Sequence, residues 1–117
     1  MHIDTAVLPV KRARKDDYIA LAKLMGEKFR AAGAISVTEY WADDLDAGEV
    51  TSYPRAVQAE ADEAVVLAIN VWPDEATRNA AMGAVMQDPD LGPKFADAPM
   101  DMRRMFFGAF EPLVSIS

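Results

Sequence analysis

The sequence predicts an α+β fold, in which two helices lie on one face of a four-stranded antiparallel sheet. Apolar, β-branched runs alternate with two amphipathic segments in the order β-α-β-β-α-β. Two βαβ halves in this order build a sheet of that kind. The 117 residues are 51% hydrophobic, which is enough material for one core. Residues 1–117 are therefore expected to form a single domain.

The first half of the chain contributes a strand, a helix and a second strand. Residues 3–10 are β-branched and apolar, which predicts a strand. Asp16 or Asp17 is expected to cap the helix and Gly33 to terminate it. Residues 34–41 alternate in polarity and predict the second strand. The apolar residues at helical spacing, which define a buried helix face, are Tyr18, Leu21, Ala22, Met25 and Phe29.

A polar connection, residues 42–62, separates the two halves of the chain. Pro54 disfavours helical geometry at Tyr53, so a short extended piece is expected at this point. Asp43 and Asp44 open the connection. Adjacent carboxylates without further ligands more often form a turn than hold a cation, so no metal site is predicted here.

The second half repeats the pattern of strand, helix and strand. Residues 64–72 give the strongest strand signal, and Pro73 and Asp74 open a helix that continues to about Met86. Residues 104–114 are expected to form the last strand. The helix residues expected to point inward are Ala81, Met82, Val85 and Met86.

Both faces of the predicted sheet are apolar. On the third strand, Val65, Leu67, Ile69 and Val71 alternate with Val66, Ala68 and Trp72. On the last strand, Met105, Phe107 and Ala109 alternate with Phe106 and Phe110. Two helices cover only one face, and no remaining segment is long enough to cover the other. A second copy of the chain is therefore expected to cover it, which predicts a homodimer of two facing sheets.

Composition excludes several classes of function. The net charge is −7, so a phosphate backbone would be repelled and nucleic-acid binding is not expected. The one basic segment, Lys11 to Lys15, fits a solvated loop. The N-terminus lacks the pattern of a signal peptide, and no apolar run spans a bilayer, so we expect a cytoplasmic protein without membrane contact.

Cofactor chemistry has little support in the sequence. There is no cysteine and one histidine, His2, and the glycines are scattered, so neither a metal site nor a phosphate-binding loop is predicted. His2 and Asp4 share one face of the first strand and would form an acid–base pair. A single terminal histidine is more often exposed and inert.

Two arginines beside apolar residues are the candidate ligand-binding groups. Arg55 lies between Tyr53 and Val57, and Arg104 precedes Met105 and Phe106. A guanidinium forms a bidentate contact with a carboxylate, so the pair is interpreted as an anionic-ligand site at the end of the sheet. The alternative is that both arginines form salt bridges within the protein. The acidic residues available for that are Asp43, Asp44, Asp101 and Glu111.

Asn70 and Trp72 complete the candidate site, which otherwise consists of Arg55, Arg104 and Tyr53. Asn70 interrupts an apolar strand, and its amide would bond either to a ligand or water in a cavity or to a neighbour across the sheet. Trp72 would line the mouth of a pocket or pack in the core.

Several motifs resemble a bacterial family known as domain of unknown function 1428 (DUF1428). The resemblance spans nearly the whole chain and implies a ferredoxin-like fold that pairs into a dimeric α+β barrel, with no established activity. The family usually has histidines where this sequence has Ala32 and, approximately, Thr77, so no role is carried over from them. The matching motifs are residues 7–10, 33–34, 43–44, Gly48, 51–57, 85–86, 88–89, 104–105, Gly108 and Phe110.

Two functions stay open at this point. The first is a small-molecule binding protein or a cofactor-free enzyme, which requires an apolar cavity that contains Asn70 and an arginine. The second is a non-catalytic regulatory or stress-related homodimer, which requires an interface packed without a cavity. A role linked to signal-recognition-particle RNA, which the resemblance suggests, conflicts with the acidic charge.

Overall fold

The computed structural model describes residues 1–117 and confirms the predicted order of elements. The strands are β1 (His2–Lys11), β2 (Ser36–Trp41), β3 (Glu63–Trp72) and β4 (Phe106–Phe110). The helices are α1 (Lys15–Ala31), α2 (Tyr53–Ala56), α3 (Glu75–Met86) and α4 (Gly92–Phe95), and a 3-10 turn, η1, spans Arg12–Arg14. One antiparallel sheet has the order β2-β3-β1-β4, which is the predicted ferredoxin-like arrangement.

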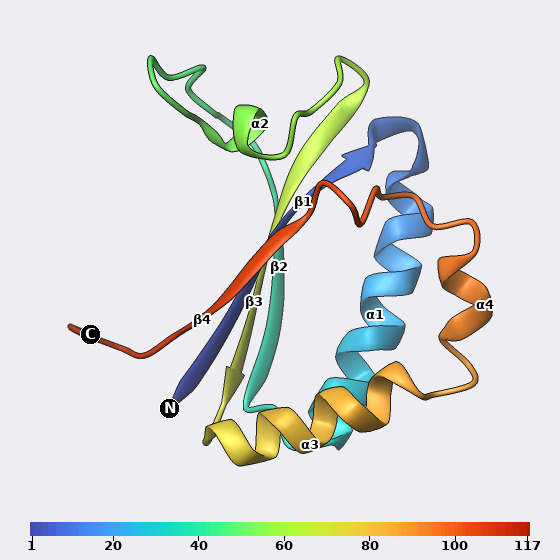
Figure 1. Cartoon of the computed structure of the whole chain (residues 1–117), viewed down its shortest axis with the longest axis vertical. Coiled ribbons are helices and arrows are strands. Elements are labelled where there is room, and N and C mark those ends of the chain that lie inside the picture. The colour runs from blue at the N-terminus through green and yellow to red at the C-terminus, as the bar shows by residue number, and fades with distance from the viewer.

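The two faces of the sheet are covered differently. Figure 1 shows α1, α3 and α4 on one side and α2 on the other. Two clusters of buried residues lie on the helix side. The larger joins Leu21 and Phe29 of α1 to Trp72 of β3, and the rings of Phe29 and Trp72 meet edge to face at 5.8 Å. The smaller joins Leu8 of β1 to Tyr18.

The connection between β2 and β3 covers more of the sheet than its sequence suggested. Val57, which is fully buried, packs on Val7 and Val65 at one end of the face opposite α1. The expectation that no segment of the chain reaches this face is therefore wrong at that end. The segment reaches it because α2 folds the connection back across β1 and β3 (Figure 1).

The short helix α2 replaces the extended piece expected around Pro54. Pro54 lies in the first turn of α2, where its missing N–H is not needed for a helical hydrogen bond. The Oγ atom of Ser52 accepts a hydrogen bond from the backbone N–H of Arg55 at 3.2 Å and caps this turn.

The helix starts and the inward helix residues are partly as predicted. Asp74 caps α3, because its carboxylate accepts the N–H of Thr77 at 2.7 Å. Neither Asp16 nor Asp17 caps α1; both lie in its first turn, where a carboxylate meets the positive end of the helix dipole. Ala81 and Val85 are buried as predicted, Met82 is half-buried, and Met86 is largely exposed.

The last strand is shorter than predicted. Its pairing with β1 ends at Phe110 opposite Ile3, and Pro112, two residues further along the chain, has no N–H to donate to a continued ladder. Residues 111–117 therefore leave the sheet. At the other end, Arg104 precedes β4 and is held by side-chain contacts.

Gly33 is expected to tolerate no side chain, in contrast to Gly83. Gly33 has φ +116°, and a Cβ atom there would lie 2.7 Å from Cγ2 of Thr77. We expect Gly33→Ala to destabilise the fold by about 1 to 3 kcal/mol. Gly83 lies in α3 with nothing within 4 Å of an added Cβ, so Gly83→Ala should stabilise the fold by roughly 0.5 to 1 kcal/mol. Urea unfolding of both variants measures the contrast, and equal effects would contradict it.

Candidate functional site

A cavity of about 350 Å³ lies between the sheet and the helices. Its floor includes Ala6 of β1 and Ala68 of β3, which are directly paired in the sheet. Ala22 and Gly26 of α1 lie above them. Because these four residues have a methyl group or no side chain at all, the helix layer does not fill the space over the centre of the sheet. The volume is within the range of ligand pockets.

Methionines form much of the wall of this space, which we call the methionine-lined cavity. Six of the seven methionines line it, and Met1 is the exception. Their thioether side chains are flexible and polarisable, so they adapt to the shape of an apolar ligand and make favourable contacts with aromatic rings. The cavity methionines are Met25, Met82, Met86, Met100, Met102 and Met105. Met86, Met102 and Phe107 are exposed and mark the open side.

A buried carboxylate holds the polar groups at one end of the cavity. The carboxylate of Asp4 accepts the indole N–H of Trp72 at 2.9 Å and the Nε–H of Arg78 at 2.9 and 3.2 Å. Nη1 of Arg78 donates to Asn79 at 3.2 Å. Nη2 donates to no protein group, so the outer edge of this guanidinium keeps hydrogen-bond capacity beside the cavity.

His2 lies against the same carboxylate. Its Nε2 atom is buried, 3.5 Å from Oδ1 of Asp4, and has no hydrogen-bond partner. The expectation of an exposed terminal histidine is therefore wrong. The strand begins at His2, so the ring packs on the sheet beside Asp4 rather than extending into solvent.

Asn70 offers the second polar contact to the cavity. It lies in β3 between Val37 of β2 and Asp4 of β1, on the helix face of the sheet. Its side chain makes no hydrogen bond within the protein and lines the cavity. A free amide supplies both a donor and an acceptor. The structure thus places an apolar cavity, Asn70 and an arginine together. The arginine is Arg78, and not Arg55 or Arg104 as the sequence predicted.

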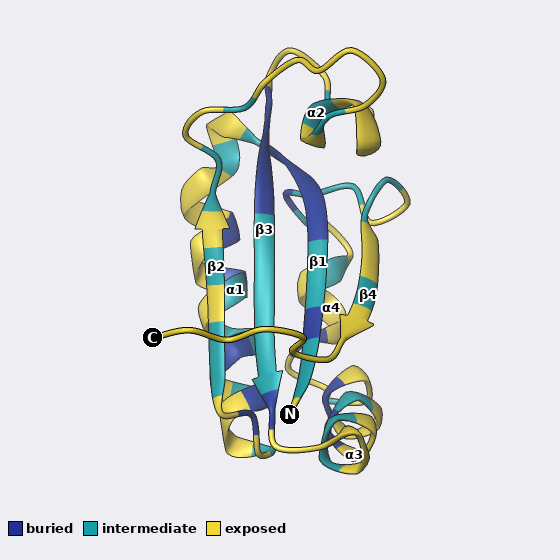
Figure 2. Ribbon diagram, turned by 90° about the vertical axis from the view of Figure 1, so that its left-hand side faces the viewer, coloured by how far each residue is buried: buried dark blue, intermediate teal, exposed yellow.

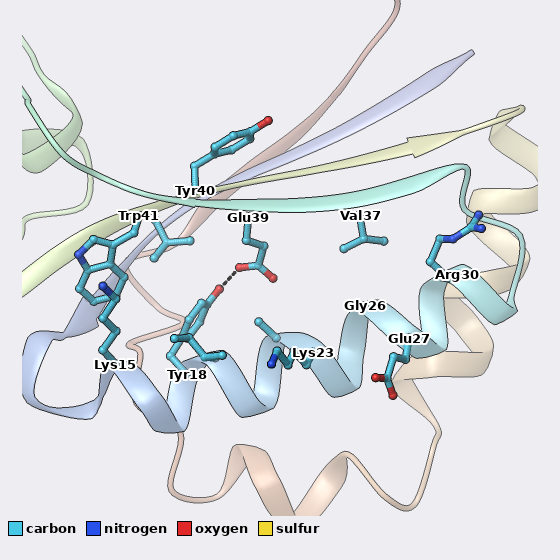
Figure 3. A pocket seen from close by; sticks show the side chains of 13 residues that line it. Lys15, Tyr18, Lys23, Gly26, Glu27, Arg30, Val37, Glu39, Tyr40 and Trp41 are labelled. Atoms are coloured by element: carbon cyan, nitrogen blue, oxygen red, sulfur yellow. Dashed lines mark hydrogen bonds between the residues drawn. The ribbon is translucent and has the colours of Figure 1, made fainter.

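The wall toward β2 contains a carboxyl–phenol pair. The hydroxyl of Tyr18 donates a hydrogen bond to the carboxylate of Glu39 (Figure 3). Burial raises the pKa of Glu39, and the bond from Tyr18 partly opposes this rise. Burial also raises the pKa of Tyr18, with a smaller contribution from the charge of Glu39.

Tyr18 and Glu39 separate the cavity from a surface groove of about 840 Å³ between α1 and β2. Figure 3 shows Glu39 and Val37 pointing from β2 toward α1, while Tyr40 points away. Lys15, Lys23 and Arg30 also line this groove. Glu39 forms no ion pair with any of them, and neither lysine nor arginine contributes to its pKa.

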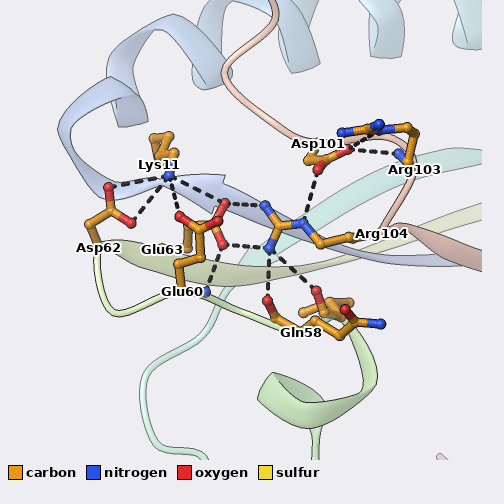
Figure 4. Close-up of polar contacts among 9 residues, drawn as sticks. Lys11, Gln58, Glu60, Asp62, Glu63, Asp101, Arg103 and Arg104 are labelled. Atoms are coloured by element: carbon orange, nitrogen blue, oxygen red, sulfur yellow. Dashed lines mark hydrogen bonds and ion pairs between the residues drawn. The ribbon is translucent and has the colours of Figure 1, made fainter.

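Arg104, predicted to bind a ligand, is occupied by protein groups (Figure 4). Its Nη1 and Nη2 atoms donate to the two carboxylate oxygens of Glu63 at 2.7 and 2.6 Å. Its Nε donates to Asp101 at 2.9 Å, and the carbonyl of Gln58 accepts a further bond at 2.9 Å. Of the two alternatives drawn from the sequence, Arg104 forms the salt bridge within the protein.

Arg55 and Tyr53 lie in α2, on the other side of the sheet from the methionine-lined cavity (Figure 1). Arg55 donates through Nη1 to the backbone carbonyl of Glu49 at 2.8 Å, and both side chains are exposed. Neither Asp43 nor Asp44 pairs with an arginine. The five predicted site residues therefore do not converge on one pocket: Asn70 lines the cavity, and fully buried Trp72 reaches its edge through Asp4.

Two of the four basic residues of the segment Lys11 to Lys15 pair with carboxylates. Lys11 contacts Glu60 at 3.0 Å and Asp62 at 3.2 Å. Arg14 contacts Asp17 at 3.0 Å and Asp97 at 3.3 Å. The Nζ atom of Lys15 lies 4.7 Å from the centre of the Trp41 ring, a cation–π contact.

The fold and its cavity define an α+β protein of the ferredoxin-like class, and comparison with known proteins places it further. The chain belongs to the family described as "Protein of unknown function (DUF1428)", which matches residues 1–102. It is 34% identical over 113 residues to the uncharacterized protein YbaA of Escherichia coli strain K12, covering 97% of each chain. The predicted family is therefore confirmed.

Solved structures of low sequence identity share the fold. An antibiotic biosynthesis monooxygenase has a TM-score of 0.57 at 13% identity, covering 97% of this chain and 100% of that one. A NIPSNAP domain protein from Burkholderia xenovorans has a TM-score of 0.55 at 11% identity, covering 100% and 99%. No helix here has the length and apolarity needed to cross a bilayer.

Proposed function

We propose that this protein binds a small, largely apolar molecule with one polar end in the methionine-lined cavity. The observation that carries the proposal is the combination of an apolar cavity with Asn70 and Arg78 on its wall. An apolar cavity with a few polar groups is typical of a small-molecule binding site, and a protein packed without a cavity would lack it. The apolar body of the ligand would lie on Ala6 and Ala68.

The polar groups favour a hydrogen-bonding head group rather than a strong anion. The charge of Arg78 is already balanced by Asp4 at 2.9 Å, so a carboxylate ligand would gain little from it. The free amide of Asn70 and the free Nη2 of Arg78 instead suit a carbonyl or hydroxyl oxygen. This modifies the predicted anionic-ligand site, which needed an unpaired Arg55 and Arg104.

Filling the floor of the cavity should abolish binding. We expect β-tetralone or β-naphthol to bind the wild type in calorimetry, and Ala68→Met to weaken binding by at least about tenfold, roughly 1.4 kcal/mol. Ala84→Met makes the same change at an exposed position of α3 and should bind like the wild type. Arg55→Ala should also leave binding unchanged. If neither compound binds, or Ala68→Met binds equally well, the proposal is contradicted.

We also propose that the protein works as a homodimer through the open part of the sheet. Phe106 and Phe110 of β4 pair with Val7 and Ile3, and with Ile69 and Leu67 they present an apolar surface on the side away from α1. Figure 2 shows the tail after β4 crossing in front of this face. Leu113 and Ile116 in the tail are 95% and 92% exposed. An apolar face beside an exposed apolar tail fits contact with a second copy.

A further inference from the structure

The carboxyl group of Glu39 lies in the wall of an apolar cavity without a cation as partner. It lies on the helix face of β2, in the wall of the methionine-lined cavity, and the hydroxyl of Tyr18 donates to it. Glu39 is half-buried, and a carboxyl group withdrawn from water is normally matched by a cation, because desolvating a charge is costly. Lys15, Lys23 and Arg30 of α1 line the neighbouring groove, but none of them forms an ion pair with Glu39.

A carboxyl group with these properties suits proton transfer. Burial raises its pKa above the ordinary value of 4.5, which makes it a better base than an exposed carboxylate. The Tyr18 hydroxyl fixes one oxygen, Oε1, and leaves Oε2 without a hydrogen-bond partner in the protein. The free oxygen is therefore available to a bound molecule.

The register of the strands places Glu39 beside the middle of a ligand. Glu39 is paired with Ala68, and Asn70 lies two residues further along β3 on the same face. Two residues along a strand span roughly 6.6 Å. Consider a molecule that lies on the floor formed by Ala6 and Ala68, with its oxygen at Asn70. The carbon atoms next to its carbonyl group then lie over Ala68, beside the Glu39 carboxyl group.

We propose that Glu39 is a catalytic base that transfers protons on a small ketone bound in the methionine-lined cavity, and that Tyr18 positions it. The inference rests on the proposed binding function. The Glu39 carboxylate removes a proton from the carbon next to the carbonyl group. The C–H electron pair forms the new C=C bond, the carbonyl π pair moves to oxygen, and the Asn70 amide donates a hydrogen bond to that oxygen.

Return of the proton completes the reaction and regenerates the carboxylate. Protonation at the same carbon exchanges its hydrogen with solvent, and protonation at a conjugated carbon gives an isomer. No oxidant, reductant or cofactor takes part, because atoms and electrons balance between ketone and enolate. The class of reaction is therefore tautomerisation or isomerisation of a carbonyl compound.

Hydrogen exchange of β-tetralone in deuterated water tests this assignment. Calorimetry first measures binding of the ketone. Proton NMR then follows the loss of signal from the hydrogens on the carbons next to the carbonyl group, as deuterium replaces them. We expect Glu39→Gln to bind the ketone within about threefold of the wild type and to exchange it at least about 100-fold more slowly. Glu27→Gln, on the exposed rim of the groove, should exchange like the wild type.

The possible results separate the two proposals. Equal exchange by wild type and Glu39→Gln, with the ketone bound, would overturn the role of Glu39 and leave the binding function standing. If β-tetralone does not bind while β-naphthol does, the ketone assignment fails alone. If neither binds, the binding function fails, and the catalytic assignment with it.

The variant Tyr18→Phe tests the positioning role and does not depend on the folding of Glu39→Gln. The bond from Tyr18 lowers the pKa of Glu39, so its removal should raise that pKa. The pH at which the exchange rate reaches half its maximum should therefore move upward in Tyr18→Phe. An unchanged midpoint would overturn the assignment of Tyr18.

Discussion

Replacing Arg104 by alanine is expected to destabilise the fold by about 3 to 5 kcal/mol, because the change leaves a buried carboxylate without its main cation. Glu63 has 1% of its side chain exposed, and Arg104 meets both of its carboxylate oxygens. Lys11, at 3.8 Å, is too distant to replace these two hydrogen bonds. Urea unfolding at pH 7 measures the loss.

Two controls isolate the ion pair. Arg103→Ala removes the adjacent arginine, which is 93% exposed, and should change stability little. The double change Glu63→Leu with Arg104→Met removes both charges and should recover most of the lost stability, since an apolar pair avoids the cost of desolvation. Equal losses in Arg103→Ala and Arg104→Ala would contradict the interpretation.

The same ion pair predicts how acid affects the protein. The bonds from Arg104 are the main cause that lowers the pKa of Glu63 from 4.5 to about 2. A carboxyl group whose pKa is lower in the folded than in the unfolded state stabilises the fold at every pH above its pKa in the unfolded state. This stability should be present above about pH 4.5 and lost as the pH falls to about 2. In Arg104→Ala, stability should fall less over that interval.

Phe106→Asp is expected to separate the proposed homodimer into monomers. Phe106 is 44% exposed in the single chain and faces away from the helices, opposite Val7. In a dimer of facing sheets a carboxylate at this position would be buried without a partner. We expect the dissociation constant to rise by on the order of 100-fold or more. Sedimentation velocity at micromolar concentration measures it.

The next residue supplies the matched control for this experiment. Phe107 is 72% exposed, yet it lies on the helix face of β4 and lines the open side of the cavity. Phe107→Asp should therefore leave the dimer intact. A wild type that sediments as a stable, folded monomer would contradict the proposed assembly, as would equal dissociation in both variants.

The fold was predictable from the sequence because it depends on periodicity. Alternation along β3 correctly assigned Leu67 and Ile69 to one face and Ala68 and Trp72 to the other. The details that failed depend on tertiary contacts. The role of Pro54 at the start of α2 depends on Ser52 as a cap, and the burial of Val57 depends on the return of the connection to β1.

The candidate site was less predictable, because a cavity depends on the residues that are small. Asn70 was found through its polar break in an apolar strand, whereas Arg78 and Glu39 look like ordinary surface charges in the sequence. The one available signal was the alternation itself, which puts Asp4, Glu39 and Asn70 on the same face as Trp72. For Arg104 the sequence left a ligand and a salt bridge as alternatives, and its main partner, Glu63, was not foreseen because it is 41 residues distant.

NMR of the isotope-labelled methionine methyl groups during titration with β-naphthol tests most directly whether the methionine-lined cavity binds a ligand. Six of the seven methionines line the proposed binding cavity, and Met1 lies outside it. We predict that the six cavity signals shift together and saturate while that of Met1 stays fixed, and that Ala68→Met removes the response. Saturating binding that leaves these signals unmoved would contradict the assignment of the cavity.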